Sequence, residues 1–342
     1  MIKTVAIVSL SHGTLGEGFA RHELELGVSR LEKYGLKVKF MNNTLKSHDY
    51  LKAHPEKRAE DLLQAFADDE VDMILCAIGG DDTFRLLPYL FSDDELKKVV
   101  NKKIFLGFSD TTTNHFMLNR VGLSTFYGQS FLADLCELED EMLPYTKKYF
   151  EELISTGTIK EITPSDIWYE CRTDFSERQR GKKLLSHKDS KGFELLQGKS
   201  VFSGKIFGGC IETLFDMYEG EWYEESAVLC ERYGILPTLK EWEGKILLLE
   251  SSEMKIEPET YRRALQALKE KGIFDVISGI IVGKPADEVY YEEYKKALTD
   301  TVDNKYLPIV YNVNIGHALP RCIIPLGVNA TVDIEKQRIV FE

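Results

Sequence analysis

The sequence predicts an α/β protein, with a doubly wound and mainly parallel sheet in its N-terminal part and a second α/β domain with a β-rich tail in its C-terminal part. Two observations support this prediction. Short apolar runs alternate with amphipathic stretches in the first third of the chain, which is typical of βαβ units. The alternation returns after residue 200 and ends in short runs that are typical of antiparallel strands.

Apolar runs in the N-terminal part predict buried parallel strands at Thr4–Leu10, Lys37–Met41, Met73–Ile78 and Lys103–Phe108. Between the first two runs, apolar residues recur at helical spacing from Phe19 to Tyr34, and Gly35 follows at the position of a helix C-cap. Further helices are expected at Arg58–Ala67, Thr83–Leu90 and Asp110–Val121. The last two follow their strands directly, as helices do at the carboxyl ends of a doubly wound sheet.

The middle of the chain differs in composition. Residues from about 156 to 200 are polar and charged, and they show no sustained period. A connection of this length is usually a functional loop, a lid or a linker. We therefore expect an N-terminal α/β domain over residues 1–155, a linker or lid over 156–200 and a C-terminal domain over 201–342.

Ordered elements return in the C-terminal part. A strand at Lys205–Phe207 is followed by Gly208 and Gly209, which predict a turn. Helices are expected at Ile211–Tyr218 and Pro258–Lys271, the second with Pro in its first turn and Gly just past its end. The remaining predicted strands are Lys245–Leu249, Gly279–Val282, Ile309–Val313, Cys322–Leu326, Ala330–Ile334 and Arg338–Phe341.

The charge balance excludes polyanions as main partners. The 342 residues carry 43 Lys and Arg against 56 Asp and Glu, a net charge of −13. Nucleic acids and anionic membranes both require a basic face, so we expect neither as a partner. Val5–Leu10 is shorter than a signal-peptide core, and no run approaches the roughly 20 apolar residues of a membrane span. The six scattered cysteines lack metal-ligand spacing, so we expect reduced thiols in a cytoplasmic protein.

One serine lies in a predicted strand-to-helix turn, within the segment Gly107–Thr112. Ser109 follows an apolar strand, and Asp110 opens a helix. Such a turn exposes the hydroxyl at the carboxyl edge of the sheet, as a nucleophile elbow does, and the helix N-terminus aims N–H groups at developing negative charge. The segment is not the hydrolase GxSxG motif, because Thr111 replaces the second glycine. The alternative is a serine that only caps the helix.

A pair of glycines follows the preceding predicted strand. Gly79 and Gly80 let the backbone approach a ligand closely and can present N–H groups to an oxyanion or a phosphate. The segment Gly79–Thr83 is similar to the Gly-Gly-Asp-Gly-Thr motif of NAD and lipid kinases. However, Asp82 stands at the motif's third glycine, where a carboxylate would oppose a triphosphate. A plain turn between a strand and a helix is the other interpretation.

A serine nucleophile needs a general base and an acid that orients it. Of the seven histidines, His317 is the best candidate because it follows a predicted buried strand at the carboxyl edge of the sheet. Glu250 ends the apolar strand Lys245–Leu249, where its carboxylate could orient an imidazole. A structural histidine and a salt-bridge acid are the alternatives. Together, Ser109, Glu250 and His317 all fall at predicted strand ends, in that order along the chain.

With these motifs in place, the sequence resembles the LD-carboxypeptidase family of serine peptidases, which includes muramoyltetrapeptide carboxypeptidases and microcin C self-immunity peptidases. The resemblance extends over almost the whole chain, and many matches in the same order are more specific than any single one. The matching segments are the N-terminal strand, Gly79-Gly80, Gly107-Phe108-Ser109-Asp110, Gly198-Lys199, Ser203-Gly204-Lys205, Gly208-Gly209-Cys210, Leu249-Glu250, Gly316-His317 and Pro325-Leu326-Gly327.

The resemblance implies a Ser-Glu-His triad at a two-domain interface, with Ser109 as nucleophile, His317 as general base and Glu250 as the orienting carboxylate. The family's oxyanion donors correspond to backbone N–H groups at Gly80 or Asp81 and at Asp110. By the same resemblance, the protein needs no metal or cofactor and is a homodimer.

The loop Ile78–Asp82 and the long middle segment are more similar to the microcin-immunity branch than to cell-wall-recycling members, which tend to carry an Arg-Gly-Gly-Tyr-type loop. That branch stacks an aromatic side chain on a nucleotide, and Trp168, Tyr169 and Phe175 are candidates, although these residues could equally pack a loop into the core. The expected substrate is a small peptide or a peptidyl nucleotide, either an L,D-linked muropeptide or a microcin C-like aminoacyl nucleotide.

Two rival functions stay open on the sequence. One is a nucleotide kinase built around Gly79–Thr83. The other is a binding protein that keeps the fold but has lost its catalytic activity.

Overall fold

The computed structural model describes residues 2–342 and divides them into two compact units. Unit 1 comprises residues 2–158 and Arg172–Leu184, and unit 2 comprises Ile159–Cys171 and Leu185–Glu342. The predicted linker or lid, residues 156–200, thus contributes to both units. None of the helices over residues 2–342 is long and apolar enough to cross a membrane.

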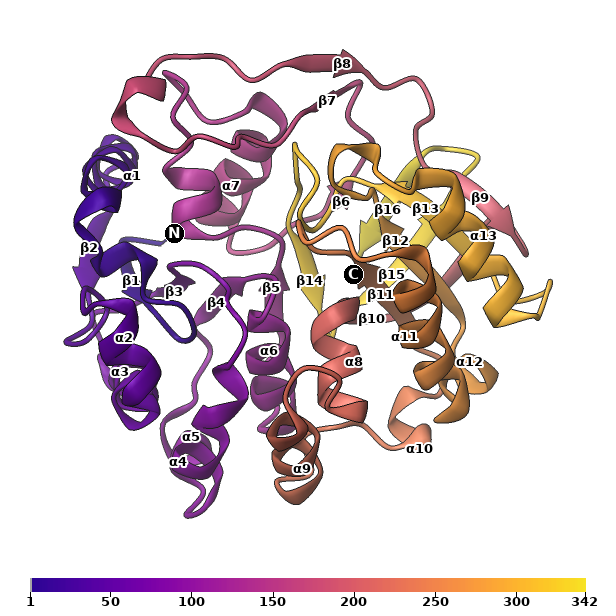
Figure 1. The fold of residues 1–342 in the computed structure, drawn as a ribbon, viewed down its shortest axis with the longest axis horizontal. Helices are drawn as coiled ribbons and strands as arrows, with labels where there is room; N and C mark the ends of the chain where they lie inside the picture. The colour runs from indigo at the N-terminus through magenta and orange to yellow at the C-terminus, as the bar shows by residue number, and fades with distance from the viewer. Residues whose placement is uncertain (1) are drawn as a thin grey trace. The chain divides into compact units, whose positions relative to one another are not determined.

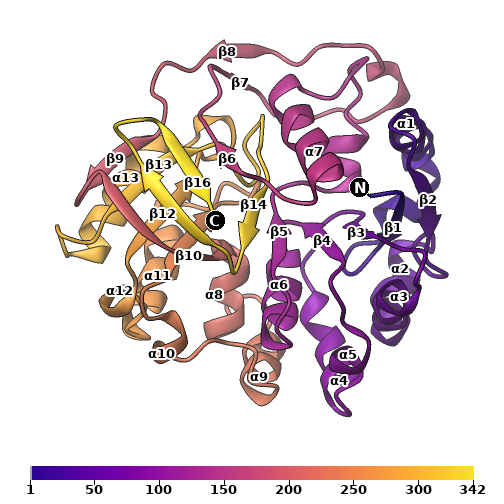
Figure 2. The ribbon, with the colours of Figure 1, turned by 180° about the vertical axis from the view of Figure 1, so that it is seen from behind.

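Unit 1 contains a parallel sheet with the strand order β5-β4-β3-β1-β2. Helices α1 and α7 lie on one side of this sheet, and α3 and α6 lie on the other (Figures 1 and 2). Its elements are β1 Thr4–Val8, α1 Arg21–Lys33, β2 Lys37–Phe40, α2 His48–Ala53, α3 Pro55–Ala67, β3 Met73–Cys76, α4 Leu87–Phe91, α5 Glu95–Val99, β4 Ile104–Gly107, α6 Thr111–Arg120, β5 Thr125–Tyr127 and α7 Pro144–Thr156.

The apolar runs of unit 1 form strands because both faces of the sheet are covered by helices. Every residue of β1 and β3 is buried, which explains the continuous apolar stretches in place of an alternating pattern. Helix α1 ends just before Gly35, whose φ of +76° fits a C-cap glycine. The predicted doubly wound sheet is confirmed.

Unit 2 contains a mixed sheet with the strand order β6-β16-β15-β10-β11-β12-β13-β9. Its elements are β6 Glu161–Ile162, β7 Ile167–Tyr169, β8 Ser186–Lys188, β9 Glu194–Gln197, β10 Val201–Cys210, α8 Ile211–Glu219, α9 Glu224–Arg232, α10 Leu239–Trp242, β11 Ile246–Glu250, α11 Pro258–Glu270, α12 Ile273–Val276, β12 Gly279–Gly283, α13 Tyr291–Val302, β13 Ile309–Val313, β14 Ile324–Leu326, β15 Asn329–Asp333 and β16 Arg338–Phe341.

The centre of this second sheet is parallel, from β10 through β11 and β12 to β13. Strands β15, β16 and β6 continue it antiparallel on one side, and β9 does so on the other. Strands β11, β12 and β13 are buried along their whole length. Helices α8, α11 and α13 pack side by side. The predicted C-terminal α/β domain with a β-rich tail is confirmed.

The turn predicted at Gly208 and Gly209 is wrong, because β10 continues through both glycines to Cys210. Gly208 has a φ of +137°, and a Cβ added to it would lie 2.1 Å from the carbonyl oxygen of Leu248 on β11. The glycine therefore serves the close approach of two parallel strands rather than a reversal of the chain.

The middle segment contains short strands that its sequence did not reveal. Strands β7 and β8 form an antiparallel pair in which Trp168 lies opposite His187. Strands of three residues are too short to produce a period that can be recognised in a sequence.

We expect the substitution Gly208→Ala to destabilise unit 2 by on the order of 2 kcal/mol, since the new methyl group meets the Leu248 carbonyl and the backbone conformation disfavours L side chains. The change would be measured as a lower urea midpoint. Gly18→Ala is the control, because nothing lies within 4 Å of an added Cβ there. Equal midpoints for the two variants would contradict the explanation.

Candidate active site

Ser109 lies in the turn between strand β4 and helix α6 of unit 1. Its φ is +66°, in the left-handed region that residues other than glycine rarely adopt. Its backbone N–H donates a hydrogen bond of 3.1 Å to the hydroxyl of Tyr127, which is buried at the end of β5. A serine held in a strained strand-to-helix turn has the geometry of a nucleophile elbow.

Two glycines make room for this turn. A Cβ added to Gly79 would lie 2.7 Å from the Cβ of Ser109 and 2.8 Å from its Oγ. A Cβ added to Gly107 would lie 2.6 Å from Cγ2 of Thr111 and 2.9 Å from Sγ of Cys76. The chain can therefore bring the loop after β3 against the serine only because these two side chains are missing.

A buried hydroxyl and a buried carboxylate hold the loop after β3. Ser11 Oγ accepts hydrogen bonds from the N–H groups of Asp81 at 3.1 Å and Asp82 at 3.4 Å, and it donates one of 2.6 Å to Asp110 Oδ2. The same carboxylate oxygen accepts the N–H of Thr83 at 2.9 Å. These contacts join the segment after β1, the glycine loop and the start of α6.

The three predicted oxyanion donors differ in whether their N–H groups are already hydrogen-bonded within the protein. The N–H of Asp81 is directed to Ser11 Oγ. For the N–H groups of Gly80 and Asp110, we find no acceptor among residues 2–342. Gly80 and Asp110 are therefore better placed than Asp81 to donate to an anion.

A buried ion pair anchors the end of the glycine loop. Arg58, on α3, donates from Nη1 and Nη2 to the two oxygens of Asp82 at 2.5 and 3.2 Å, and also to the carbonyl oxygens of Leu10 and Ser11. Both charged side chains are almost completely buried. Asp82 thus has a structural role, and its carboxylate occupies the position at which a kinase phosphate loop has glycine.

Burial dominates the protonation of Asp110. The loss of water contacts raises the pKa of its carboxyl group to about 6, although the hydrogen bonds from Ser11 and Thr83 act in the opposite direction. The carboxyl group next to Ser109 therefore has a pKa of about 6, well above that of an ordinary aspartate.

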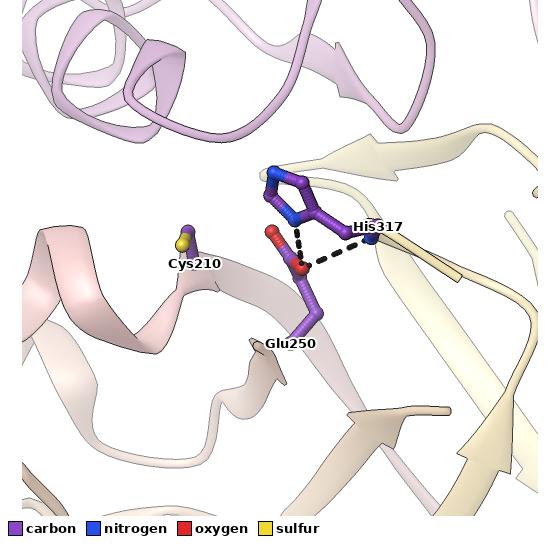
Figure 3. Close-up of side chains that lie close together, drawn as sticks. All are labelled: Cys210, Glu250 and His317. Atoms are coloured by element: carbon purple, nitrogen blue, oxygen red, sulfur yellow. Dashed lines mark hydrogen bonds and ion pairs between the residues drawn. The ribbon is translucent and has the colours of Figure 1, made fainter. Parts of the chain in front are cut away.

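Glu250 and His317 form a hydrogen-bonded pair in unit 2 (Figure 3). Nδ1 of His317 donates to Oε2 of Glu250 at 2.8 Å, and the backbone N–H of His317 donates to the same oxygen at 3.2 Å. Both side chains are buried. Burial opposes a charge on the imidazole, but the Glu250 carboxylate outweighs it and raises the pKa of His317 above its ordinary value. The pair has the geometry of a base oriented by a carboxylate.

The other imidazole nitrogen contacts a second carboxylate. Oε2 of Glu253 lies 3.0 Å from Nε2 of His317, and the Glu253 side chain is 68% exposed. Both nitrogens of the ring therefore face a carboxylate, one from the last residue of β11 and one from the segment that follows it.

A third carboxylate, Glu212 on α8, binds the segment that follows β11. Its Oε1 accepts the N–H of Ser252 at 2.9 Å and the Ser252 hydroxyl at 2.8 Å. Burial, followed by the nearby charge of Glu250, raises the pKa of Glu212. Glu212 thus fixes the backbone two residues beyond Glu250.

Cys210, Glu250 and His317 could together hold a metal ion, because their ligand atoms lie within 4.8 Å of one another. The Cys210 thiol instead donates to Glu212 Oε2 at 3.2 Å. Burial and the neighbouring carboxylates raise the pKa of Cys210 well above its ordinary value, whereas a metal ligand must lose that proton. The absence of a metal stays a prediction.

Two of the three predicted stacking residues lie on β7 in unit 2. The ring of Trp168 stacks on that of His187 with centroids 4.3 Å apart, and Nζ of Lys284 lies 5.2 Å from the Trp168 ring. The N–H of Tyr169 donates to the carbonyl oxygen of Leu319, two residues after His317. The third, Phe175, belongs to unit 1, where it is 56% exposed and its carbonyl oxygen accepts a hydrogen bond from His22.

The sequence predicted the residues expected to carry the chemistry in each unit, but not several of the residues that hold them in place. Ser109 shares unit 1 with all three predicted oxyanion residues, and Glu250 shares unit 2 with His317. The missed partners are polar or aromatic residues outside the recognised motifs, namely Ser11, Arg58, Tyr127, Glu212 and Glu253. Only Glu253 lay next to a motif, three residues after Glu250.

Comparisons with known proteins match both halves of the chain. A family model described as the LD-carboxypeptidase N-terminal domain matches residues 5–128, and one described as the C-terminal domain matches residues 203–332. The microcin C7 self-immunity protein MccF of Escherichia coli is 28% identical, over 94% of this chain and 88% of its own length. A probable murein peptide carboxypeptidase of Bacillus subtilis is 27% identical, over 94% and 87%.

Among solved structures, an MccF-like protein from Streptococcus pneumoniae, in complex with AMP, is 56% identical to this chain. The match covers 100% of this chain and 99% of the other, with a TM-score of 0.99.

We expect Asp110→Asn to change how stability depends on pH. A carboxyl group whose pKa rises from 3.8 to about 6 on folding contributes stability below pH 3.8 that is lost as the pH rises through 6. At about 1.4 kcal/mol for each pH unit, the loss is about 3 kcal/mol. Asparagine keeps the acceptor but does not titrate, so the decline in unfolding free energy between pH 4 and pH 8, measured with urea at both values, should be smaller by roughly 2 to 2.5 kcal/mol, since part of the loss occurs below pH 4. An identical decline in both proteins would contradict this account.

Proposed function

Because this chain belongs to the LD-carboxypeptidase family, we propose that it hydrolyses a terminal amide bond with Ser109 as nucleophile, His317 as general base and Glu250 as the carboxylate that orients the base. The chain is a serine-type hydrolase of the LD-carboxypeptidase and MccF-like kind. The assignment of these three residues rests chiefly on the buried hydrogen bond between Nδ1 of His317 and Glu250. The strained turn at Ser109 supports it independently.

In the proposed reaction, Ser109 Oγ attacks the carbonyl carbon of the scissile amide while Nε2 of His317 takes the hydroxyl proton. Glu250 stabilises the imidazolium that forms, and the N–H groups of Gly80 and Asp110 donate to the oxyanion. The imidazolium then protonates the leaving amine, and an acyl-enzyme results. Water, deprotonated by His317, releases the carboxylic acid and restores the serine.

For the substrate, we favour an aminoacyl nucleotide over an L,D-linked muropeptide. The reason is the 56% identity to an MccF-like protein whose structure contains AMP. Trp168, already stacked on His187, is the best candidate for contact with a base, and Tyr169 lies beside it on β7. The muropeptide is the second candidate, on the resemblance to the murein peptide carboxypeptidase.

We also propose that the protein is a cytoplasmic homodimer that works without a metal or cofactor, and that residues 156–200 act as a lid or linker. None of the six cysteines forms a disulfide within residues 2–342, which is compatible with a reducing compartment. The homodimer rests on the family resemblance alone. Light scattering would determine the oligomeric state, and dialysis against a chelator would leave the activity unchanged.

We expect Ser109→Ala to reduce hydrolysis by several orders of magnitude, because the nucleophile is removed. A muramoyl tetrapeptide and aspartyl sulfamoyl adenosine should be assayed side by side, and we expect cleavage of the second. An active-site serine probe should label the wild type and not the variant. Unchanged turnover by purified Ser109→Ala would remove the proposal, and absent labelling of the wild type would favour a binding protein without catalysis.

The pH dependence of kcat/KM should report His317. A base must be neutral, and Glu250 raises the pKa of His317, so activity should rise with pH with a midpoint above 6.5. Glu250→Gln should move the midpoint to lower pH and reduce the rate by roughly 10⁴-fold. Asp110→Asn is the control for a second group that titrates near 6, and it should leave the midpoint in place. A midpoint that follows Asp110 and not Glu250 would contradict the assignment.

A further inference from the structure

Glu253 contacts the atom that the proposed reaction needs. Its Oε2 lies 3.0 Å from Nε2 of His317, the nitrogen that would take the serine proton. Nδ1 of the same ring is already bound to Glu250. The side chain of Glu253 is 68% exposed, whereas those of His317 and Glu250 are buried. The contact is therefore made by a side chain that can leave without opening the core.

The backbone around Glu253 is held in place on both sides. The Ser252 hydroxyl donates to buried Glu212 and accepts the N–H of Met254 at 3.3 Å. The N–H of Lys255 donates to the carbonyl oxygen of Ser252 at 3.2 Å, and Lys255 Nζ pairs with Asp287. Rotation of the side chain can thus remove the carboxylate from Nε2, but the carboxylate stays close to the imidazole.

During catalysis Nε2 must face the serine hydroxyl, so the Glu253 carboxylate gives way when the substrate is bound. In any reaction of this type the hydroxyl oxygen must come within about 3 Å of the base, and the carbonyl carbon within about 3 Å of the hydroxyl. The substituent on the carbon next to that carbonyl is therefore within reach of the Glu253 carboxylate, which lies beside Nε2 before the substrate binds. A carboxylate there attracts a cation and repels an anion.

This inference rests on the proposed function. We propose that Glu253 binds the free α-ammonium group of an aminoacyl substrate and thereby selects it over substrates whose α-nitrogen is acylated. An aminoacyl nucleotide carries this ammonium beside the scissile carbonyl. In a muropeptide the corresponding nitrogen belongs to a peptide bond and carries no charge. Glu253 would therefore determine the choice between the two candidate substrates.

The test compares aspartyl sulfamoyl adenosine with its N-acetyl derivative. The wild type should prefer the free amine by at least about tenfold in kcat/KM, the size expected for a charge-assisted hydrogen bond. Glu253→Gln should lose this preference, mainly through a higher KM for the free amine. The matched control is Glu259→Gln, which removes an exposed carboxylate paired with Arg262 on α11 and should keep the preference.

Two outcomes would overturn the inference while leaving the hydrolase intact. In one, Glu253→Gln keeps the full preference for the free amine. In the other, it accelerates both substrates equally, so that Glu253 only obstructs Nε2. If the wild type cleaves neither substrate, the proposed substrate class fails, and the inference fails with it.

Discussion

The hydrogen bond from Nδ1 of His317 to the carboxylate of Glu250 is the interaction on which the candidate chemistry of unit 2 depends. A carboxylate at the end of a fully buried strand needs partners, because its removal from water is costly. His317 supplies two, its ring and its backbone N–H. The close approach requires Gly316, where an added Cβ would lie 2.2 Å from Glu250 Oε2. Strand, glycine and histidine therefore act together, and the raised pKa of His317 is the electrostatic consequence.

In unit 1, the main structural constraint is that Ser109 has a left-handed backbone conformation, which serine disfavours. Such strain persists only where the surroundings determine it. Here the Tyr127 hydroxyl binds the Ser109 N–H, and Gly79 leaves space for its side chain. Ser11 links the glycine loop to Asp110, and the buried Arg58–Asp82 ion pair fixes the far end of that loop. Because Asp82 is committed to Arg58, the resemblance to a kinase loop is a similarity of glycines and not of chemistry.

The parallel strands of both units could be predicted because buried strands produce continuous apolar runs, and α1 because its period ends at a C-cap glycine. Ser109, Glu250 and His317 could be chosen because each follows such a run. The turn at Gly208 and Gly209 was predicted wrongly, because a glycine in a sequence can indicate either a turn or a close approach of two backbones. Only the position of the neighbouring strand distinguishes these two cases. The roles of Ser11 and Arg58 could not be predicted from the sequence, because their hydrogen-bond partners Asp110 and Asp82 lie far away in the chain.

The sequence by itself determined the family, the type of each sheet and the residues at which the chemistry was to be sought. These are local properties, namely periodicity, turn residues and the order of motifs along the chain. Only the tertiary structure decided that Nδ1 of His317 meets Glu250, that Glu253 meets Nε2, and that Glu212 binds Ser252, which lies between the two glutamates in the chain. Contacts between loops that follow different strands depend on strand order and register, which arise from packing across the whole sheet and leave no local pattern in the chain.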